Sequence, residues 1–468
     1  MFALLRAGLW EREPDDLSPF PLNAKQWQKV YELSVQQTTT GIIYKGMSHL
    51  PDNLLPQETL LMQWAAKVEA IERRNKKMNA VLQSLLNLMN SNGLHPVLQK
   101  GQGVAAFYPE PLLRESGDID LYFTKNEYDK ATALMVQNGA TPKKSADGGC
   151  VYLWQNVEIE HHTRLVDIHN PFKKKYINSL IERYGFVQVL RHSEPQALRH
   201  SEAERSEAEE SRCAMRSFPF AYAQGQDDAT TNTTQDDDNH RHSEAEPLRH
   251  SEAERSEAEE SRYAMRSFPF AYAQGQDDAT TNTAQDEDNH RHSEPQAKNL
   301  FIQGDPSLAL RMTNTPAPIL NLLMLNAHIL KHILGHGVGL RQFCDIAMGY
   351  HALRGSYNPQ ELETICRKTG LYKWTIQLHA FLKEYLGADD KDFPFADAGE
   401  KCSDELLEIV LSGGNFGQYG STRSGSKSRF GRKFKTLLSY REHAGFSRKY
   451  GGSEAFWVPV SLIIGNIR

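Results

Sequence analysis

Apolar residues recur at three- and four-residue steps over residues 57–92, which is the spacing of a buried helix face. They are Leu61, Trp64, Val68, Ile71, Met78, Leu82, Leu85 and Met89. The pair Asn92-Gly93 follows them, and glycine after the last periodic residue commonly ends a helix. We therefore predict one long helix here.

The pattern then changes to short apolar runs, which are typical of strands. HPVLQKG (95–101) predicts a short buried strand that ends at a glycine, and VAAFY (104–108) predicts one or two helical turns. DIDLYF (118–123) predicts a second strand. These segments indicate the beginning of a sheet directly after the long helix.

A helix and a hairpin follow the second strand. TKNE (124–127) has the T-x-x-E spacing of a capping box and predicts a helix that ends at Asn138-Gly139. The runs CVYLW (150–154) and VEIEHHTRLV (157–166) predict two strands joined through Gln155-Asn156. The order helix, strand, strand, helix, strand, strand predicts a small α/β unit with a mixed sheet.

The last third of the chain has the periodicity of helices. The stretches 318–337 and 340–355 predict helices of a C-terminal bundle. PVSLIIGN (459–466) is too short to span a membrane, so we expect a terminal helix or strand there. The predicted fold class is α+β: a small mixed-sheet core between an N-terminal helical region and a C-terminal helical bundle.

A repeat interrupts this core. Residues 191–240 recur nearly unchanged at 241–290, and a third copy begins at 291. A period of 50 residues is usual for solenoids, but two copies cannot build a stack. The repeat also has very few apolar residues to bury, so we predict a disordered insertion over 191–297. Its one apolar segment, SFPFAYA (217–223, repeated at 267–273), leaves a binding role open.

The chain therefore divides into four predicted regions. They are an N-terminal helical region (1–92), a sheet-containing core (93–190), the insertion (191–297) and a C-terminal helical domain (298–468).

Composition and charge limit the class of protein and its expected location in the cell. The net charge of −6 gives no support for general nucleic-acid binding. The five cysteines are scattered without a C-x-x-C spacing, which favours reduced thiols over a disulfide framework or a zinc site. No apolar run approaches the ~20 residues of a membrane span. The first sixteen residues reach acidic side chains too early for a secretory signal, so we expect a cytoplasmic protein.

Two aspartates stand at alternate positions of the second predicted strand. Residues i and i+2 of a strand point to the same side, so Asp118 and Asp120 would repel unless a cation lay between them. Magnesium prefers such oxygen ligands. The later strand repeats the pattern with Glu158 and Glu160, and a third carboxylate would complete a two-metal site for phosphoryl-type transfer.

A glycine turn precedes these acids. In LQKGQG (98–103), a turn at Gly101 and Gly103 would let backbone N–H groups approach phosphates. Lys100 and Arg114 flank the acidic strand and could neutralise phosphate charge, although a surface lysine and a structural arginine are the commoner cases.

The order of glycine turn, D-x-D strand and acidic strand resembles the polymerase-β-like nucleotidyltransferase superfamily. The stretch 95–123 more closely resembles a bacterial family of uncharacterised nucleotidyltransferases, with the pattern L-K-G, then Y-P, then R-x-x-G-D-I-D. VEIEHHTRL (157–165) is similar to the I-E-x-H strand of that family, and HILKHILGHGVGLRQFCDIAMGY (328–350) to its helical tail.

The resemblance implies a Mg²⁺-dependent enzyme that moves a nucleoside monophosphate from an NTP to an acceptor hydroxyl. Asp118, Asp120 and Glu160 are then the catalytic residues and the ligands of two Mg²⁺ ions, with Glu158 in reserve for Glu160. The nucleotide-binding residues would be Gly101, Gly103, Lys100 and Arg114. The acceptor would be an unknown small molecule, protein or RNA, and no membrane partner is expected.

Several alternatives stay open. The superfamily's usual Gly-Ser pair is Gly101-Gln102 here, and the gap from Gly101 to Asp118 is longer than usual. These departures leave open an alternative function, that of a catalytically silent adaptor that binds a nucleotide or a partner. The repeat could also mark a decaying gene. The aspartate pair could cap a helix, and the glutamate pair could line a solvated hairpin face.

Histidines offer two further candidates. One of His161 and His162 is expected to orient Glu160, and the other to lie at the surface. His328, His332 and His336 share a helix face, a spacing that could bind metal, but we expect a structural or substrate-facing role. The basic stretch 420–435 is expected to be a solvated loop, with phosphate contact as the alternative.

Overall fold

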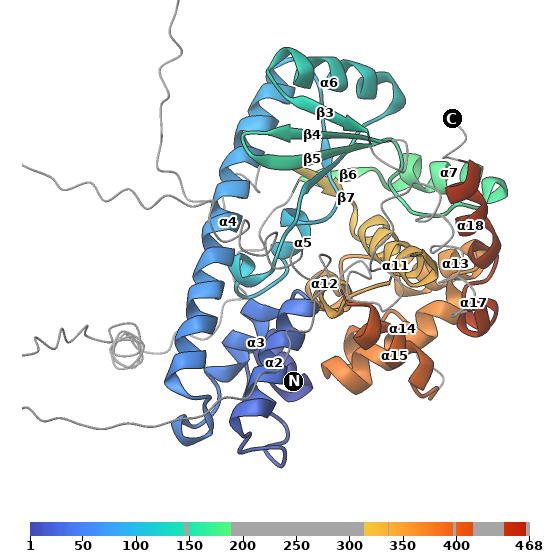
Figure 1. Ribbon diagram of the computed structural model, residues 1–468. Coiled ribbons are helices and arrows are strands. Elements are labelled where there is room, and N and C mark those ends of the chain that lie inside the picture. The colour runs from blue at the N-terminus through green and yellow to red at the C-terminus, as the bar shows by residue number, and fades with distance from the viewer. Residues whose placement is uncertain (145–148, 189–312, 336, 396–398, 415–443, 465–468) are drawn as a thin grey trace, which may run out of the picture. The chain divides into compact units, whose positions relative to one another are not determined.

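The protein is described by a computed structural model that covers residues 1–144, 149–188, 313–335, 337–395, 399–414 and 444–464 (Figure 1). These residues belong to one compact unit, which is built from both the N-terminal and the C-terminal part of the chain. The predicted insertion (191–297), its SFPFAYA segments and the basic stretch 420–435 lie outside the described residues.

The fold is α+β, as predicted. A seven-stranded mixed sheet has the order β3-β4-β5-β2-β1-β7-β6. The strands are β1 (Val97–Leu98), β2 (Ile119–Tyr122), β3 (Thr141–Lys144), β4 (Cys150–Trp154), β5 (Val157–His162), β6 (Phe186–Gln188) and β7 (Asn314–Pro316).

Helices surround this sheet within the unit. The N-terminal part contains the helices α1 (Phe2–Trp10), α2 (Ala24–Gln36), α3 (Thr40–Met47), α4 (Glu58–Ser91), α5 (Gln102–Ala105), α6 (Lys125–Gln137) and α7 (Lys174–Tyr184). The C-terminal part contains α11 (Pro318–Gly335), α12 (Leu340–Leu353), α13 (Pro359–Thr369), α14 (Tyr372–Leu386), α15 (Asp404–Gly413), α17 (Ala444–Tyr450) and α18 (Glu454–Ile464). Short 3₁₀ turns are η1 (Asp52–Leu54), η2 (Pro111–Leu113), η3 (Pro171–Lys173) and η4 (Asp390–Asp392).

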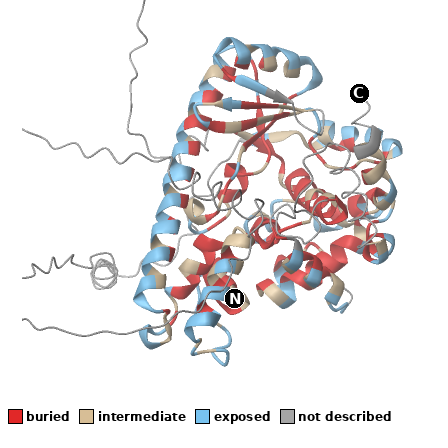
Figure 2. Ribbon diagram, in the orientation of Figure 1, coloured by how far each residue is buried: buried red, intermediate tan, exposed pale blue. Residues whose placement is uncertain are grey.

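Helix α4 confirms the long helix predicted from apolar periodicity. Its C-terminal half, including Met78, Leu82 and Leu85, packs in one buried cluster with Ile119 and Ile159 of the sheet. Figure 2 shows the alternation of buried and exposed residues along this helix that the spacing implies. Helix α4 thereby covers one face of β2 and β5, so residues of the opposite parity on these strands face away from it.

The hairpin between β4 and β5 is also confirmed. Gln155 and Asn156 both adopt positive φ, at 50° and 59°, as a two-residue hairpin turn requires. The register places Trp154 opposite Val157 and Tyr152 opposite Ile159. This register fixes which face each later residue of β5 occupies.

The capping box predicted at Thr124 is wrong. The Thr124 side chain makes no cap hydrogen bond and lies 2.6 Å from the Glu127 carboxylate, in a side-chain hydrogen bond. The other Glu127 oxygen accepts from the backbone N–H of His95. Glu127 thus ties the start of α6 to the loop before β1.

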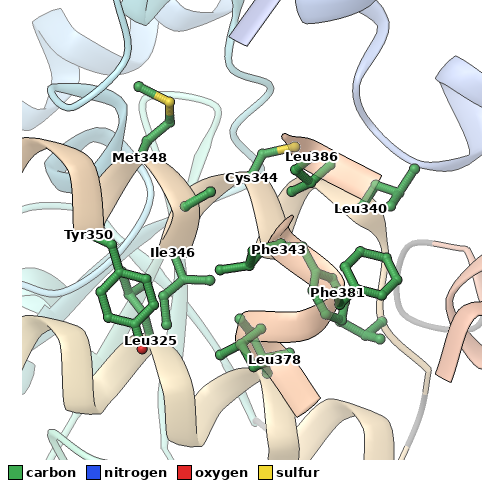
Figure 3. Close-up of a cluster of buried hydrophobic side chains, with 14 of the residues drawn as sticks. Leu325, Leu340, Phe343, Cys344, Ile346, Met348, Tyr350, Leu378, Phe381 and Leu386 are labelled. Carbon is green, nitrogen blue, oxygen red and sulfur yellow. The ribbon is translucent and has the colours of Figure 1, made fainter. Parts of the chain in front are cut away.

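The C-terminal helices form the second core. Helix α11 is buried on nearly every side, and α12 and α14 pack against it. Figure 3 shows Leu325 of α11, Phe343 and Ile346 of α12, and Leu378 and Phe381 of α14 in this cluster. The bundle gives the cavity described below a rigid wall.

The N-terminal helices make one unusually close contact. A Cβ added at Gly8 would lie 1.9 Å from the Ile42 carbonyl oxygen, and one added at Gly46 would lie 1.9 Å from that of Leu4. Glycine at both positions lets α1 and α3 approach backbone to backbone. Among the described residues, no helix is both long and apolar enough to cross a membrane.

Strands β3, β6 and β7 were missed by sequence reasoning. Strands β6 and β7 pair antiparallel, with Gln188 directly opposite Asn314, and β7 pairs parallel with β1. The chain therefore leaves the sheet after β6 and returns to it at the adjacent position. The segment between these two residues joins points that are already neighbours.

Candidate active site

Two neighbouring parallel strands place the acidic residues. Strands β2 and β5 pair so that Asp120 lies opposite Glu160 and Tyr122 opposite His162. The preceding residues Ile119 and Ile159 point into the core beneath α4 and α6. The alternation that the sequence predicts thus puts Asp120, Glu160 and His162 on the face away from that core.

Three ligand atoms converge on this face. One atom each of Asp120, Glu160 and His162 lies within 4.8 Å of the others. His162 Nε2 is 2.7 Å from Asp120 Oδ1 and 3.4 Å from Glu160 Oε2. His162 therefore bridges the two carboxylates, which agrees with the expectation that one histidine orients Glu160.

The other histidine of the pair is not at the surface, contrary to that expectation. His161 is fully buried, and its ring centroid lies 4.6 Å from that of Phe123 and 4.9 Å from that of Tyr152. Burial lowers the pKa of His161 to about 3 and keeps the ring neutral. Position 161 has the core-facing parity of β5, which the alternation of the strand could have revealed.

The carboxyl groups differ in charge state because their surroundings differ. Burial, and then the neighbouring Asp120, raise the pKa of Asp118 to about 6. Burial, Asp120 and Asp118 raise the pKa of Glu160 to about 7. Burial acts in the same direction on Asp120, but Lys100 and His162 outweigh it and hold its pKa well below the ordinary value.

Lys100 supplies the nearest fixed positive charge. Its Nζ lies 3.2 Å from Asp120 Oδ1. Burial would lower the pKa of Lys100, but Asp120, Asp167 and Asp118 raise it above the usual value. The ammonium therefore stays charged between two groups of carboxylates and is available to a bound anion.

The glycine turn adjoins the acids directly. Gly101 has φ 57°, and an added Cβ would lie 3.2 Å from the Asp118 carbonyl oxygen. Gly103 packs behind it against the side chain of Leu98. The Gln102 side chain is buried and its Nε2 lies 3.7 Å from Met78 Sδ, so it points into the core.

Arg114 has a structural partner. Its Nε and Nη2 reach the two carboxylate oxygens of Asp345 at 2.8 and 2.6 Å, and its Nη1 donates to Ser116 Oγ. Tyr108 Oη donates to the same Asp345 carboxylate. This buried network joins the segment before β2 to α12, and Arg114 also lines the cavity described below.

A cavity of about 540 Å³ opens over the acidic face. Lys100, Gly101, Asp118, Asp120 and Glu160 line it from the sheet side, whereas Glu158 and Gly103 do not line it. Residues of α11, α12 and α18 form the opposite wall. Its volume is within the range of ordinary small-ligand sites.

Sequence reasoning missed several residues of the opposite wall. Asp167 accepts from His328 and Lys331, and Arg341 lies close enough to Asp118 to oppose the rise in its pKa. The rings of His328 and His332 are 4.4 Å apart, as their i, i+4 spacing implies. His336, the third residue of that spacing, lies outside the described residues.

The comparison with protein families bears on this site. Residues 23–201 match the model of a family described as an uncharacterised nucleotidyltransferase. The match includes the glycine turn, β2 and β5, and confirms the resemblance over those residues, whereas the helical tail at 328–350 lies outside it. No curated protein and no solved structure matches the chain.

Proposed function

We propose that this chain, whose residues 23–201 match a nucleotidyltransferase family, transfers a nucleoside monophosphate from an NTP to an acceptor hydroxyl with the help of Mg²⁺. The observation that carries the proposal is the register of β2 and β5, in which Asp120 lies opposite Glu160, over a cavity that Asp118 also lines. The proposal keeps Glu160 as the third acid and Glu158 in reserve, which is supported by Glu160 lining the cavity where Glu158 does not.

The donor set fits magnesium. Asp118, Asp120 and Glu160 provide carboxylate oxygens, and Mg²⁺ binds through one or two carboxylates together with waters and substrate phosphates. Burial and then the neighbouring carboxylates raise the pKa of Asp118 and Glu160, and a bound cation would stabilise their ionised forms. Bound Mg²⁺ would supply Lewis-acid charge and lower the pKa of the acceptor hydroxyl.

The chain's own residues would position the nucleotide. Lys100 carries its charge into the cavity beside Asp120, where phosphate charge would gather. Gly101 gives the turn the positive φ it needs next to Asp118. In the reaction an acceptor oxygen bonds to the α-phosphorus, the bond to the β-phosphate oxygen breaks, and pyrophosphate leaves with the electron pair.

A second candidate is a catalytically silent adaptor of the same fold. The observation that favours it is Gln102, which stands where the superfamily usually has a serine and whose side chain is directed to Met78. Such a protein would bind a nucleotide or a partner through the same cavity without transferring a phosphoryl group.

Labelled nucleotides separate the two. Purified full-length protein is incubated with Mg²⁺, each of the four α-³²P-labelled NTPs, and pools of small molecules, protein and RNA. The proposal expects label on one pool from the wild type and none from Asp118→Asn/Asp120→Asn. Asp129→Asn, an exposed aspartate on α6, serves as the control and should retain transfer. Binding of a nucleotide without transfer by the wild type would favour the adaptor.

A further inference from the structure

An aspartate–histidine pair lies in the cavity wall opposite the acidic strands. His328 Nδ1 of α11 is 2.9 Å from Oδ2 of Asp167, a residue of the segment after β5. Lys331, one turn further along α11, places Nζ 3.3 Å from the other oxygen of Asp167. Both members of the pair line the cavity, and both side chains are largely buried.

The hydrogen bond determines the tautomer of His328. An ionised carboxylate only accepts hydrogen bonds, so the proton of the neutral ring lies on Nδ1. Burial would raise the pKa of Asp167, but Lys331 and His328 hold it well below the ordinary value, so the carboxylate is ionised. Nε2 of His328 therefore keeps a lone pair that can accept a proton.

The surroundings keep the ring neutral before substrate binds. Burial, and then the charge of Lys100, lower the pKa of His328 to about 4. A bound triphosphate would offset the charges of Lys100 and Lys331 and raise the basicity of the ring toward the working pH. The Asp167 carboxylate would stabilise the imidazolium that forms, as the aspartate does in other carboxylate–histidine pairs.

The pair is close to the acidic site. Lys100 contacts Asp120 and is also near enough to Asp167 for that carboxylate to raise its pKa. His328 in turn contributes to the low pKa of Asp120. The two groups of residues thus share one cavity, with Lys100 between them.

We propose that His328 is the general base of the transfer reaction and that Asp167 is its positioning residue. The inference rests on the proposed function. The acceptor O–H proton moves to His328 Nε2 as the acceptor oxygen bonds to the α-phosphorus, and pyrophosphate leaves with the electrons of the broken P–O bond. Glu160 is then free to act as a metal ligand.

The chain contains a matched control for this pair. His351 Nδ1 of α12 lies 2.8 Å from Oδ2 of Asp392, so the geometry is nearly the same. His351 and Asp392 do not line the cavity, and the His351 side chain is 47% exposed. His351→Gln tests the loss of an Asp-paired imidazole away from the reaction.

The experiment compares kcat and KM for His328→Gln, Asp167→Asn and His351→Gln with the labelled NTP and the acceptor pool that the wild type uses. Losing a general base costs about 10²–10⁴-fold in rate. We expect a loss of this size in kcat for His328→Gln, a smaller loss for Asp167→Asn that Asp167→Glu partly restores, and wild-type rates for His351→Gln. The Mg²⁺-dependent thermal shift with NTP should be unchanged in all of them, which reports an intact fold and nucleotide site.

Chemical rescue separates a base from a structural histidine. His328→Ala leaves a space beside Asp167. If this variant lacks only proton transfer, added imidazole should raise its transfer rate at least tenfold. Full activity of His328→Gln, or a loss in His328→Ala that imidazole leaves unchanged, overturns the role of His328 as a base. The proposed function still stands in that case if the wild type transfers label. A wild type that transfers no label with any NTP overturns both.

Discussion

Asp120 and Glu160 lie directly opposite each other on the parallel strands β2 and β5. The residues are 40 positions apart in the chain, and only the pairing of the two strands brings their carboxylates to one face. Lys100 and His162 both contact Oδ1 of Asp120. This arrangement underlies the proposal that the cavity holds Mg²⁺ and a triphosphate.

Glu160→Gln should separate the two candidates for the third acid. Because Glu160 lines the cavity next to Asp120, we expect a loss of about 10²–10³-fold in transfer rate, typical of removing one group that stabilises transition-state charge. Glu158→Gln should lose less than tenfold, because Glu158 lies outside the cavity lining. Initial rates with labelled NTP measure both, and the reverse ranking would assign the third acid to Glu158.

Magnesium binding should strengthen as pH rises from about 5.5 to 7.5. The folded-state pKa values of Asp118 and Glu160 are about 6 and 7, above their ordinary values, so the folded chain carries extra protons over this range. Without the ion, these groups therefore lower the stability of the fold as pH rises from about 4 through 7. Mg²⁺ must displace the same protons, so its affinity grows as they are lost.

Calorimetric titration with Mg²⁺ at several pH values, in buffers of different ionisation enthalpy, measures this coupling. Over this range, proton release should be largest at the acidic end, where both carboxyls are protonated, and should be smaller in Asp118→Asn and Glu160→Gln. Affinity that is independent of pH in the wild type would mean that these carboxyls do not bind the ion.

Arg114→Ala should destabilise the fold. Arg114 and Asp345 form a buried two-point ion pair, and removing one partner leaves the other charge uncompensated, at a cost of about 3–5 kcal/mol. Lys383→Ala removes an exposed pair with Asp390 and should cost at most about 1 kcal/mol. Urea unfolding measures both; if Arg114→Ala keeps its stability and loses only NTP affinity, the predicted phosphate contact is the better account of Arg114.

Replacing residues 191–297 with a short Gly/Ser linker should leave transfer intact. Gln188 and Asn314 are paired neighbours, so a connection of almost any length can join them. A roughly sixfold shorter connection is expected to add about 1.5 kcal/mol of stability through loop-closure entropy. Soluble yield, the unfolding midpoint and transfer rate check this, and loss of transfer by a folded variant would give the repeat a role in function.

Local patterns in the sequence predicted α4, the β4–β5 hairpin and the alternation of acidic and apolar positions within β2 and within β5. Each depends on spacing within one segment, either three to four residues or two. The same alternation places His161 in the core, although its charge-bearing neighbours suggested otherwise. In place of the expected cap, Thr124 donates to the Glu127 carboxylate, whose other oxygen accepts from the backbone of His95, a contact that no local pattern encodes.

Partners far apart in the chain could not be predicted in this way. Strand β7 is three residues long and pairs with β1 more than two hundred positions away. Arg114 meets Asp345, and Asp167 meets His328, only because the C-terminal bundle packs over the sheet. The helical wall of the cavity therefore had to come from the structure, whereas the acidic wall was readable from the sequence.

The most direct test is a crystal structure with Mg²⁺ and a non-hydrolysable NTP analogue. The account predicts ions about 2.0–2.1 Å from carboxylate oxygens of Asp118, Asp120 and Glu160, with the analogue's phosphates on the same ions and near Lys100. An analogue that binds with its phosphates elsewhere, or a Glu160 side chain turned away from any ion held by the two aspartates, would contradict it.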